Sequence, residues 1–481
     1  MDARFGWSVM SRINRWASAA LGAALALGLA SQVQAAGPMP PPAYQAMARD
    51  ILKELVEINS VHAKGSTVAA QAVARRALAA GFAPADVNVL APADHPTKGN
   101  VVIRLHGKGL GKPLLLIGHL DVVEANPRDW PTDPFKLVEK DGYYYARGTE
   151  DMKGDDALVL TAMIRMKKEG FVPDRDIIAA FTADEEGGAD ANGVQWLFAA
   201  HRDLVDAGLA LNTDGDGPVW KNNVPYYVGV ETSEKIYATY ELEVTNRGGH
   251  SSLPRADNAI YQLTTGIQKL AAYRFPMHLT DTTRSYFREL GKLQKGPVGA
   301  DMQALAGPSP QAAAERFSAD PVMNALLRTT CVTTMLRAGE GESALPSRAH
   351  ATVQCRLIPG ETPAQTKATL EAVLGDPAIK VSLDEPVDSA PETPLTKDVL
   401  ARYHRLVDQF WPHLPVIPDM TPGASDSVYA RLAGVPSYVS GAILFDIDDS
   451  RAHGRDERVQ IAAFDQGGEY AYRMIKVFAA R

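Results

Sequence analysis

Short apolar runs alternate with helix-like segments through the first half of the chain. The runs are nearly continuous, which predicts strands that are buried on both faces. Strands that alternate with helices form mainly parallel sheets, and ligands of such sheets bind at the carboxyl ends of the strands. We therefore predict an α/β domain with helices on both faces of its sheet. Its strands are expected at residues 101–105, 113–118, 177–181 and 209–212, and its helices at 43–58, 69–80, 156–168 and 193–201.

The pattern changes near residue 237, where polar and apolar residues begin to alternate. Such alternation predicts half-exposed strands. Between the first two of them lie a helix-like segment and a polar segment with Pro and Ala residues at 279–320. An antiparallel sheet with helices on one face fits this region, as an inserted α+β domain. The expected boundaries are 37–236 and 390–481 for the α/β domain and 237–389 for the inserted domain. The further elements are expected as strands at 237–244, 331–336, 350–358, 435–439 and 442–445 and as helices at 258–273, 397–410 and 464–478.

Residues 1–36 have the pattern of an export signal. Arg12 and Arg15 precede an apolar segment from Ala17 to Ala30, and Val33-Gln34-Ala35 offers small residues for a signal peptidase. An uncleaved membrane anchor is the alternative, but about fourteen apolar residues are short of the ~20 that span a bilayer. We expect a cleaved signal peptide, a periplasmic or secreted protein, and no stable membrane span after cleavage.

The charge balance argues against two classes of partner. The 481 residues carry a net charge of -8, and the basic residues form no stripe along the sequence. Binding to nucleic acid or to an anionic membrane surface needs a concentration of positive charge. We therefore expect neither partner.

The two cysteines lie on two consecutive predicted strands of the inserted domain. A hairpin centred near Ser343 places Cys331 directly opposite Cys355, and export would provide an oxidising environment. A slip of one residue would instead turn the thiols to opposite faces. Between a disulfide and two buried thiols, the sequence favours the thiols.

Three adjacent carboxylates follow the predicted strand at 177–181. Asp184, Glu185 and Glu186 lie in the turn at 182–188, where mutual repulsion is costly without a cation, most simply a metal ion. Adjacent residues at a strand end point in different directions, so Glu186 can bind the metal while Glu185 faces a water molecule. An acidic, solvated turn is the alternative.

Further metal-binding side chains follow other strands. His119 ends the buried run at 113–118, and Asp121 lies on the same side, where it can accept the second imidazole N–H. Asp151 lies in a glycine-flanked turn, where helix capping is the alternative, and Asp214 follows another apolar run. His453 lies in a charged loop near the end of the chain. Together these nitrogen and oxygen donors suit two zinc ions.

Five motifs in this order resemble the co-catalytic zinc exopeptidases and deacylases. That family includes glutamate carboxypeptidase, aminoacylase, acetylornithine deacetylase and succinyl-diaminopimelate desuccinylase. The details around Gly423–Ser427 and Arg451–Glu457 are most similar to its large carboxypeptidase and N-acyl-amino-acid hydrolase branch. The five motifs are Gly118-His119-Leu120-Asp121, Asp151-Met152-Lys153-Gly154, Asp184-Glu185-Glu186-Gly187, Gly249-His250-Ser251 and His453.

The resemblance implies a centre of two Zn²⁺ per subunit, with Co²⁺ or Mn²⁺ as substitutes. Asp151 would bridge the ions and would be followed by a cis peptide bond. The resemblance implies Glu185 as the general base and Asp121 as the residue that orients His119. The remaining ligands would be His119 and Asp214 for one ion, and Glu186 and His453 for the other.

The resemblance also implies roles for the inserted domain, as a lid that forms a homodimer in many members. His250 would stabilise the oxyanion, often in the partner's active site. Arg356 would bind the substrate's carboxylate through a guanidinium, and the backbone of the turn at Gly423 would assist. Ser343 begins the stretch where the family usually has an asparagine, which weakens that expected polar contact.

These observations predict an exported di-zinc hydrolase that cleaves an amide bond next to a free carboxylate. A carboxypeptidase or dipeptidase acting on small peptides is the first hypothesis, and an N-acyl-amino-acid deacylase is the alternative. An aminopeptidase would anchor an amine instead, which Arg356 argues against. A degenerate binding module would lack a ligand or the base, whereas every such position is filled here.

Overall fold

The computed structural model describes residues 37–187, 191–384 and 387–481, so the predicted export signal lies outside the described residues. Among these residues, no helix combines the length and apolar character needed to cross a membrane. The chain divides into two compact units. The α/β unit comprises the residues up to Thr232 with Thr393–Asp419 and Ser425–Arg481, and the inserted unit comprises Ser233–Glu392 and Met420–Ala424.

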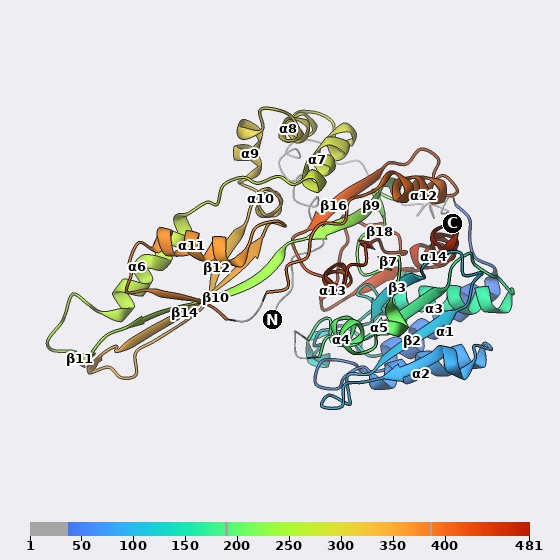
Figure 1. Cartoon of the computed structure of the whole chain (residues 1–481), viewed down its shortest axis with the longest axis horizontal. Coiled ribbons are helices and arrows are strands. Elements are labelled where there is room, and N and C mark those ends of the chain that lie inside the picture. Colours follow the sequence, from blue (N-terminus) through green and yellow to red (C-terminus); the bar gives the residue numbers. More distant parts are fainter. Residues whose placement is uncertain (1–36, 188–190, 385–386) are drawn as a thin grey trace, which may run out of the picture. The chain divides into compact units, whose positions relative to one another are not determined.

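A ten-stranded sheet forms the framework of the α/β unit. At its centre, β6 (Ile177–Thr182), β3 (Leu114–His119), β7 (Leu209–Asn212) and β17 (Ser437–Val439) run parallel to one another. Antiparallel pairs flank this core. The parallel centre confirms the predicted α/β class with a mainly parallel sheet (Figure 1). The flanking strands are β1 (Val87–Leu90) and β2 (Asn100–Leu105) on one side, and β9 (Val224–Glu234), β8 (Pro218–Lys221), β18 (Phe445–Asp446) and β16 (Val416–Thr421) on the other.

Helices cover both faces of this sheet because neighbouring residues of the central strands point to opposite sides. Leu114 and Leu116 of β3 join one buried cluster, and Leu115 and Ile117 join the other. The continuous apolar run of β3 is thus explained by burial on both faces. The first cluster includes residues of α1 (Pro42–Glu57), α2 (Thr67–Ala79), α3 (Lys153–Lys168), α12 (Lys397–Val407) and α14 (Ile461–Ala479), and the second includes residues of α4 (Gly193–Ala200), α5 (Arg202–Val205) and α13 (Ser427–Leu432).

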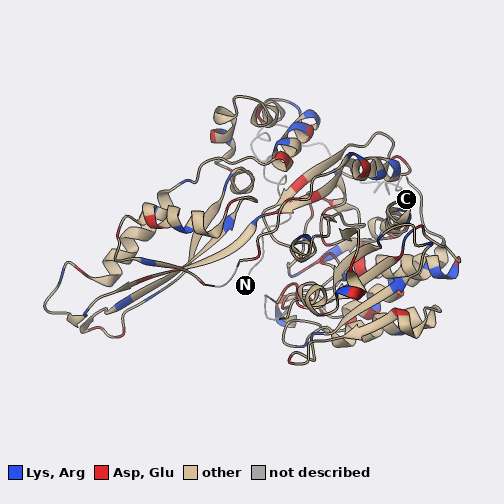
Figure 2. Cartoon of the chain, viewed as in Figure 1, with Lys and Arg blue, Asp and Glu red and all other residues tan. Residues whose placement is uncertain are grey.

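A four-stranded antiparallel sheet forms the core of the inserted unit, in the order β12 (Thr330–Ala338), β14 (Arg348–Leu357), β10 (Ile236–Thr245) and β15 (Lys380–Leu383). The helices α6 (Ala259–Ala272) and α11 (Pro363–Leu374) contribute to its buried cluster. A separate two-stranded sheet pairs β11 (Gly249–His250) with β13 (Ala344–Leu345). Acidic and basic residues are interspersed along the helices of both units (Figure 2).

Several elements differ from the sequence expectations. The polar segment at 279–320 is largely helical, and the expected strand at 442–445 is reduced to β18. The eleven-residue strand β9 was not expected. The segment at 279–320 contains α7 (Asp281–Leu293), α8 (Pro297–Ala306) and α9 (Gln311–Phe317), and α10 (Pro321–Leu327) follows it. In the α/β unit, a further small sheet joins β4 (Val138–Lys140), β5 (Tyr143–Tyr145) and β19 (Arg458–Gln460).

The preference for two free thiols was wrong, because Cys331 and Cys355 form a disulfide. The predicted register is confirmed: the two residues are directly paired between β12 and β14, with their Cα atoms 4.1 Å apart. The bulge in this pair of strands lies between Thr333 and Met335. The bulge lies between the cysteines and the turn. Pairs nearer the turn, such as Leu336 with Ala351, are offset by one residue from a hairpin centred at Ser343, and the bulge restores the predicted pairing at the cysteines.

Candidate active site

The carboxyl ends of the parallel strands bring several of the predicted site residues together. His119 is the last residue of β3, Glu185 and Glu186 follow β6, and Asp214 follows β7. These three strands are adjacent and parallel, so the residues that follow them lie at one edge of the sheet. The turn that carries Asp151 and the late loop that carries His453 reach the same edge, where Asp151 lies beside His119 and His453 lies beside Glu186.

Asp151 lies between two imidazoles and presents one carboxylate oxygen to each. Its Oδ1 atom is 3.2 Å from Nε2 of His119, and its Oδ2 atom is 2.9 Å from Nε2 of His453. The same nitrogen of His453 is 2.7 Å from Oε1 of Glu186. Nε2 of His119 is 3.7 Å from Oδ1 of Asp214. Asp151 therefore connects one cluster around His119 and Asp214 with another around His453 and Glu186.

The donor atoms of this site are close enough to share a metal ion. In each of two groups, the potential ligand atoms lie within 4.8 Å of one another. One group contains His119, Asp151 and Glu186, and the other contains His119, Glu185 and Asp214. The geometry thus places Glu185 beside two of the potential ligands, His119 and Asp214.

The electrostatics of these side chains also fit bound cations. Burial lowers the pKa of His453, but the nearby carboxylates of Asp151 and Glu186 raise it overall to about 11. Burial likewise lowers the pKa of His119, and the carboxylates of Asp151 and Asp214 raise it well above its usual value. Nε2 of His119 is buried, and although it lies 3.2 Å from Oδ1 of Asp151, the two atoms are not aligned for a hydrogen bond in the described structure. Imidazoles and carboxylates that attract positive charge are the nitrogen and oxygen donors that suit zinc.

Asp121 holds the loop after β6 rather than the His119 ring. The ring nitrogen Nδ1 of His119 lies 3.1 Å from the backbone oxygen of Asp121 and 3.7 Å from its carboxylate. That carboxylate instead accepts the backbone N–H groups of Glu185, at 3.2 Å, and Glu186, at 3.0 Å. Asp121 is 2 % exposed, so both contacts are shielded from water. Asp121 therefore lies beside His119, but the closest partner of the His119 ring is the Asp121 backbone and not the carboxylate that was predicted to accept its N–H.

Asp184 has a partner that the sequence analysis missed. Its carboxylate forms an ion pair with Lys98 and lies 2.8 Å from Nδ1 of His62. The first of the three adjacent carboxylates is therefore neutralised by a lysine and not by a metal ion. Lys98 and His62 both come before β2 in the sequence and lie outside the motifs that suggested the site. No local sequence pattern therefore identified them.

Asp151 does not cap the helix that follows it. The helix α3 begins at Lys153, so its N-cap residue is Met152, which makes no side-chain capping hydrogen bond. The peptide bond between Asp151 and Met152 is cis, as the resemblance implied. The carboxylate of Asp151 is thus left for the two imidazoles.

The remaining predicted residues lie in or next to the inserted unit and are described within it. The imidazole of exposed His250 in β11 lies 2.7 Å from the hydroxyl of Ser252, and the backbone oxygen of Ser343 accepts the N–H of Ser251. The N–H of Gly423 donates to the hydroxyl of Thr421 at 3.2 Å, within its own turn. This turn therefore already uses one of the backbone donors that were expected to face a substrate.

Arg356 lies on β14, and its guanidinium stacks 4.7 Å from the ring centre of Tyr237. Its Nη1 atom is buried and has no hydrogen-bond partner in the described structure. Burial lowers the pKa of Arg356. An arginine with a free, buried donor is suited to bind an anionic group.

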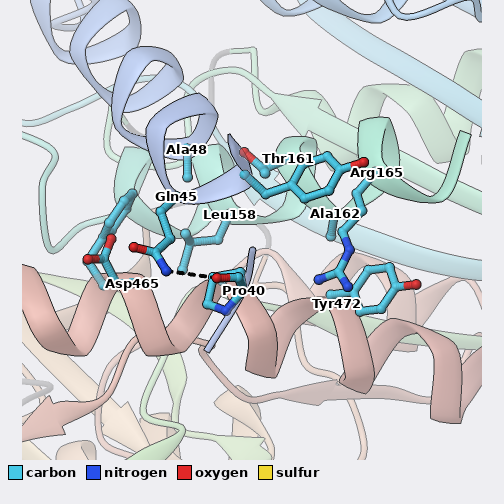
Figure 3. Close-up of a pocket in the computed structure, with 12 residues that line it drawn as sticks. Pro40, Gln45, Ala48, Leu158, Thr161, Ala162, Arg165, Asp465 and Tyr472 are labelled. Carbon is cyan, nitrogen blue, oxygen red and sulfur yellow. Dashed lines mark hydrogen bonds between the residues drawn. The ribbon is translucent and has the colours of Figure 1, made fainter. Parts of the chain in front are cut away.

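A separate small pocket in the α/β unit lies between α1, α3 and α14. Pro40, Leu158, Arg165 and Tyr472 are among the residues that line it (Figure 3). Its volume of about 10 Å³ is room for about one water molecule. This pocket is too small for an amino acid.

Comparisons with known proteins agree with this geometry. The sequence profile described as "Peptidase family M20/M25/M40" matches residues 115–477. The N-fatty-acyl-amino acid synthase/hydrolase PM20D1 of Xenopus tropicalis is 29% identical over 380 residues, which cover 76% of this chain and 72% of the relative. The probable carboxypeptidase S-like 2 of Dictyostelium discoideum is 29% identical over 375 residues, covering 76% and 71%.

A solved structure shares the fold. The M20 family metallo-carboxypeptidase Sso-CP2 from Sulfolobus solfataricus superposes with a TM-score of 0.66 and covers 90% of this chain and 99% of that chain. The two sequences are 20% identical. At this level of identity, the likeness concerns the fold.

Proposed function

Because the chain belongs to peptidase family M20/M25/M40, a family of peptidases and amidohydrolases, we propose that it hydrolyses an amide bond next to a free carboxylate. The family assignment confirms the resemblance drawn from the five motifs. The observation that carries the proposal is Asp151, whose two carboxylate oxygens each face a different histidine. Such a residue is suited to hold two cations side by side.

The proposed cofactor is a pair of Zn²⁺ ions, for which Co²⁺ or Mn²⁺ can substitute. Asp151 would contact both ions. Bound cations of this kind polarise a carbonyl group and make water a stronger acid. The other ligands would be His119 and Asp214 in one cluster, and Glu186 and His453 in the other.

Glu185 is the proposed general base. Burial raises the pKa of Glu185 well above its usual value, and the carboxylate of Asp214 raises it further. A carboxylate with a raised pKa is a better proton acceptor near neutral pH. Glu185 takes a proton from the attacking water as the new C–O bond forms. It then gives that proton to the leaving nitrogen as the C–N bond breaks.

Two residues of the inserted unit are proposed to contact the substrate. Arg356 would bind the free carboxylate through its unpartnered Nη1 atom. His250 is proposed to stabilise the developing oxyanion, because it is exposed on a two-residue strand beside small residues. Ser343 and Gly423 are the proposed minor contacts. Homodimer formation through the inserted unit is also part of this proposal.

An N-acyl amino acid is the second candidate substrate, and the relative in Xenopus tropicalis favours it. That relative is described as an N-fatty-acyl-amino acid synthase/hydrolase, whereas the Dictyostelium discoideum relative is described as a probable carboxypeptidase. Both substrate types contain an amide bond beside a free carboxylate. The proposed chemistry therefore suits both peptides and N-acyl amino acids, which differ in the group on the acyl side of the amide bond.

A substrate panel tests the proposal. The purified chain is assayed on dipeptides, on N-acyl amino acids and on the C-terminal amides of both, with and without added Zn²⁺. We expect zinc-dependent release of an amino acid from the free acids and little from the amides. Equal rates on acids and amides would contradict the carboxylate requirement. Fractionation of a producing cell tests the proposed export, since the protein should appear outside the cytoplasm and without residues 1–35.

A further inference from the structure

The carboxylate of Glu457 holds the turn that carries Asp151, although more than 300 residues separate them in sequence. Its Oε1 atom accepts the backbone N–H groups of Gly148 at 2.8 Å, Glu150 at 2.9 Å and Asp151 at 3.2 Å. Its other oxygen forms an ion pair with Arg147. Glu457 is fully buried and Arg147 is 3 % exposed, so water does not compete for these contacts.

The reverse contact is made from the same turn to the loop that carries His453. The carboxylate of Glu150 accepts the hydroxyl of Ser450 at 3.1 Å and the backbone N–H of Arg451 at 2.8 Å. Arg147 also donates to the backbone oxygen of His453 at 3.3 Å. Each loop therefore contributes a carboxylate that is bound by the backbone of the other loop.

These contacts reach the backbones of Asp151 and His453, whose side chains face each other in the site. Glu457 fixes the backbone of Asp151, and Arg147 connects Glu457 to the backbone of His453. The distance between Oδ2 of Asp151 and Nε2 of His453, 2.9 Å, depends on both loops being held in this arrangement. His119 ends a strand of the sheet, and among the described residues its ring lies against Asp121 and Asp151 rather than against either of these carboxylates. The contacts of Glu457 and Arg147 therefore support the part of the site formed by Asp151 and His453.

We propose that Glu457 and Arg147 are positioning residues that set the affinity of the metal position formed by Asp151, Glu186 and His453. This inference rests on the proposed metal centre and adds two residues to it that touch no metal ligand atom. They act through backbone groups, by fixing where Asp151 and His453 can meet. Residues that orient metal ligands in this way typically change metal affinity by about 10- to 100-fold when they are replaced.

The test measures zinc binding to the full chain by competition with a fluorescent zinc chelator. Glu457→Gln keeps the size of the side chain and an oxygen for the backbone N–H groups, but its amide places donors against Arg147. We expect one of two Zn²⁺ ions to bind about 10- to 100-fold more weakly, and the other to keep its affinity within about threefold. Arg147→Lys keeps the positive charge but loses the planar guanidinium, and should weaken the same ion.

Glu469→Gln is the matched control. Glu469 forms a similarly buried ion pair in the same unit, with Arg165 at 2.7 Å, and it also pairs with Arg473 at 2.7 Å. Removing its charge should lower thermal stability while both zinc affinities remain unchanged. Equal loss of zinc affinity in Glu469→Gln would show that the effect is general destabilisation and would overturn the proposal.

The outcomes separate this inference from the proposed function. If the wild type binds two ions and folded Glu457→Gln and Arg147→Lys bind both as tightly, the positioning role is wrong and the proposed function is unaffected. If the wild type binds two ions but hydrolyses no member of the substrate panel, the proposed function is wrong and the positioning role is still decided by the variants. A wild type that binds fewer than two ions overturns both.

Discussion

The carboxylate of Asp121 lies 3.0 Å from the backbone nitrogen of Glu186 and accepts its N–H group. The neighbouring N–H of Glu185 donates to the other carboxylate oxygen. A single buried carboxylate thus fixes the backbone of both the proposed base and a proposed ligand. Asp121 acts on the loop after β6, while its backbone oxygen serves His119.

Asp121→Asn should therefore reduce turnover more than it reduces metal binding. Asparagine has only one acceptor oxygen, so one of the two backbone N–H groups is left facing an amide donor. We expect kcat to fall by about 10- to 100-fold with zinc content near that of the wild type at saturating zinc. The measurement is the rate per bound ion. A variant that loses zinc but keeps its rate per bound pair of ions would contradict this role.

Arg356→Ala should affect free acids far more than amides. A charged hydrogen bond contributes about 1.5–3 kcal/mol, so kcat/KM for a substrate with a free carboxylate should fall by about 10- to 100-fold. The corresponding C-terminal amide should change by less than about threefold, since it offers no charge to the guanidinium. Arg337→Ala, at an exposed position of β12, is the control and should change neither rate. An equal loss on acid and amide would rule out a carboxylate anchor.

Removal of the Cys331–Cys355 disulfide should destabilise the inserted unit. The bond closes a loop with a sequence separation of 24 residues. Closing a loop of this size stabilises a protein by about 3 kcal/mol. Thiol titration of the denatured, unreduced protein should find no free thiol, and Cys331→Ala with Cys355→Ala should unfold at a lower denaturant concentration. Two free thiols per chain would contradict the disulfide.

Lys235 should make the stability of the protein depend on pH. Burial and, to a smaller extent, the charge of Arg356 lower its pKa to about 7, against an ordinary value of 10.5. Between these two values the unfolded chain binds more protons than the folded chain, so the free energy of unfolding rises with pH. Relative to Lys235→Met, the wild type should gain about 2 kcal/mol of stability between pH 7 and pH 9.

Urea unfolding of both proteins at the two pH values measures this difference. The ammonium of Lys235 donates to the backbone oxygen of Arg328 and to the hydroxyl of Thr330, so Met also removes two hydrogen bonds. That loss is common to both pH values and cancels in the comparison. A difference between wild type and variant that stays constant with pH would contradict the lowered pKa.

The sequence predicted the parts of the site that follow buried strands. Apolar runs identified β3, β6 and β7, and the residues after them, including His119 and Asp214, meet because those strands are parallel neighbours. Long-range contacts could not be predicted in this way. Glu457 pairs with the turn at Asp151, and Lys98 pairs with Asp184. The sequence around Glu457 and Lys98 is typical of exposed charged loops, so it predicts neither contact.

The fold showed a similar limit. The segment at 279–320 contains Pro, Gly and many polar residues, yet it forms helices, because capping contacts such as that of Thr280 with Thr283 begin α7 and buried residues such as Phe287 hold it. The pairing of Cys331 with Cys355 was predicted from the hairpin, but the bulge between Thr333 and Met335 was not, and a pattern of residues does not report how closely two strands approach. The local twist and spacing of the strands decide how closely two cysteines approach.

The central claim is that Glu185 moves protons beside a two-ion centre without holding an ion itself. The most direct test measures bound zinc and turnover together in Glu185→Ala, with Glu186→Ala for comparison. General base catalysis contributes about 10²- to 10⁴-fold, so Glu185→Ala should keep two zinc ions per chain and less than about a hundredth of wild-type turnover. Glu186→Ala should lose one ion. Loss of an ion from Glu185→Ala would make Glu185 a ligand, and turnover above about a hundredth of wild type would remove it from the role of base.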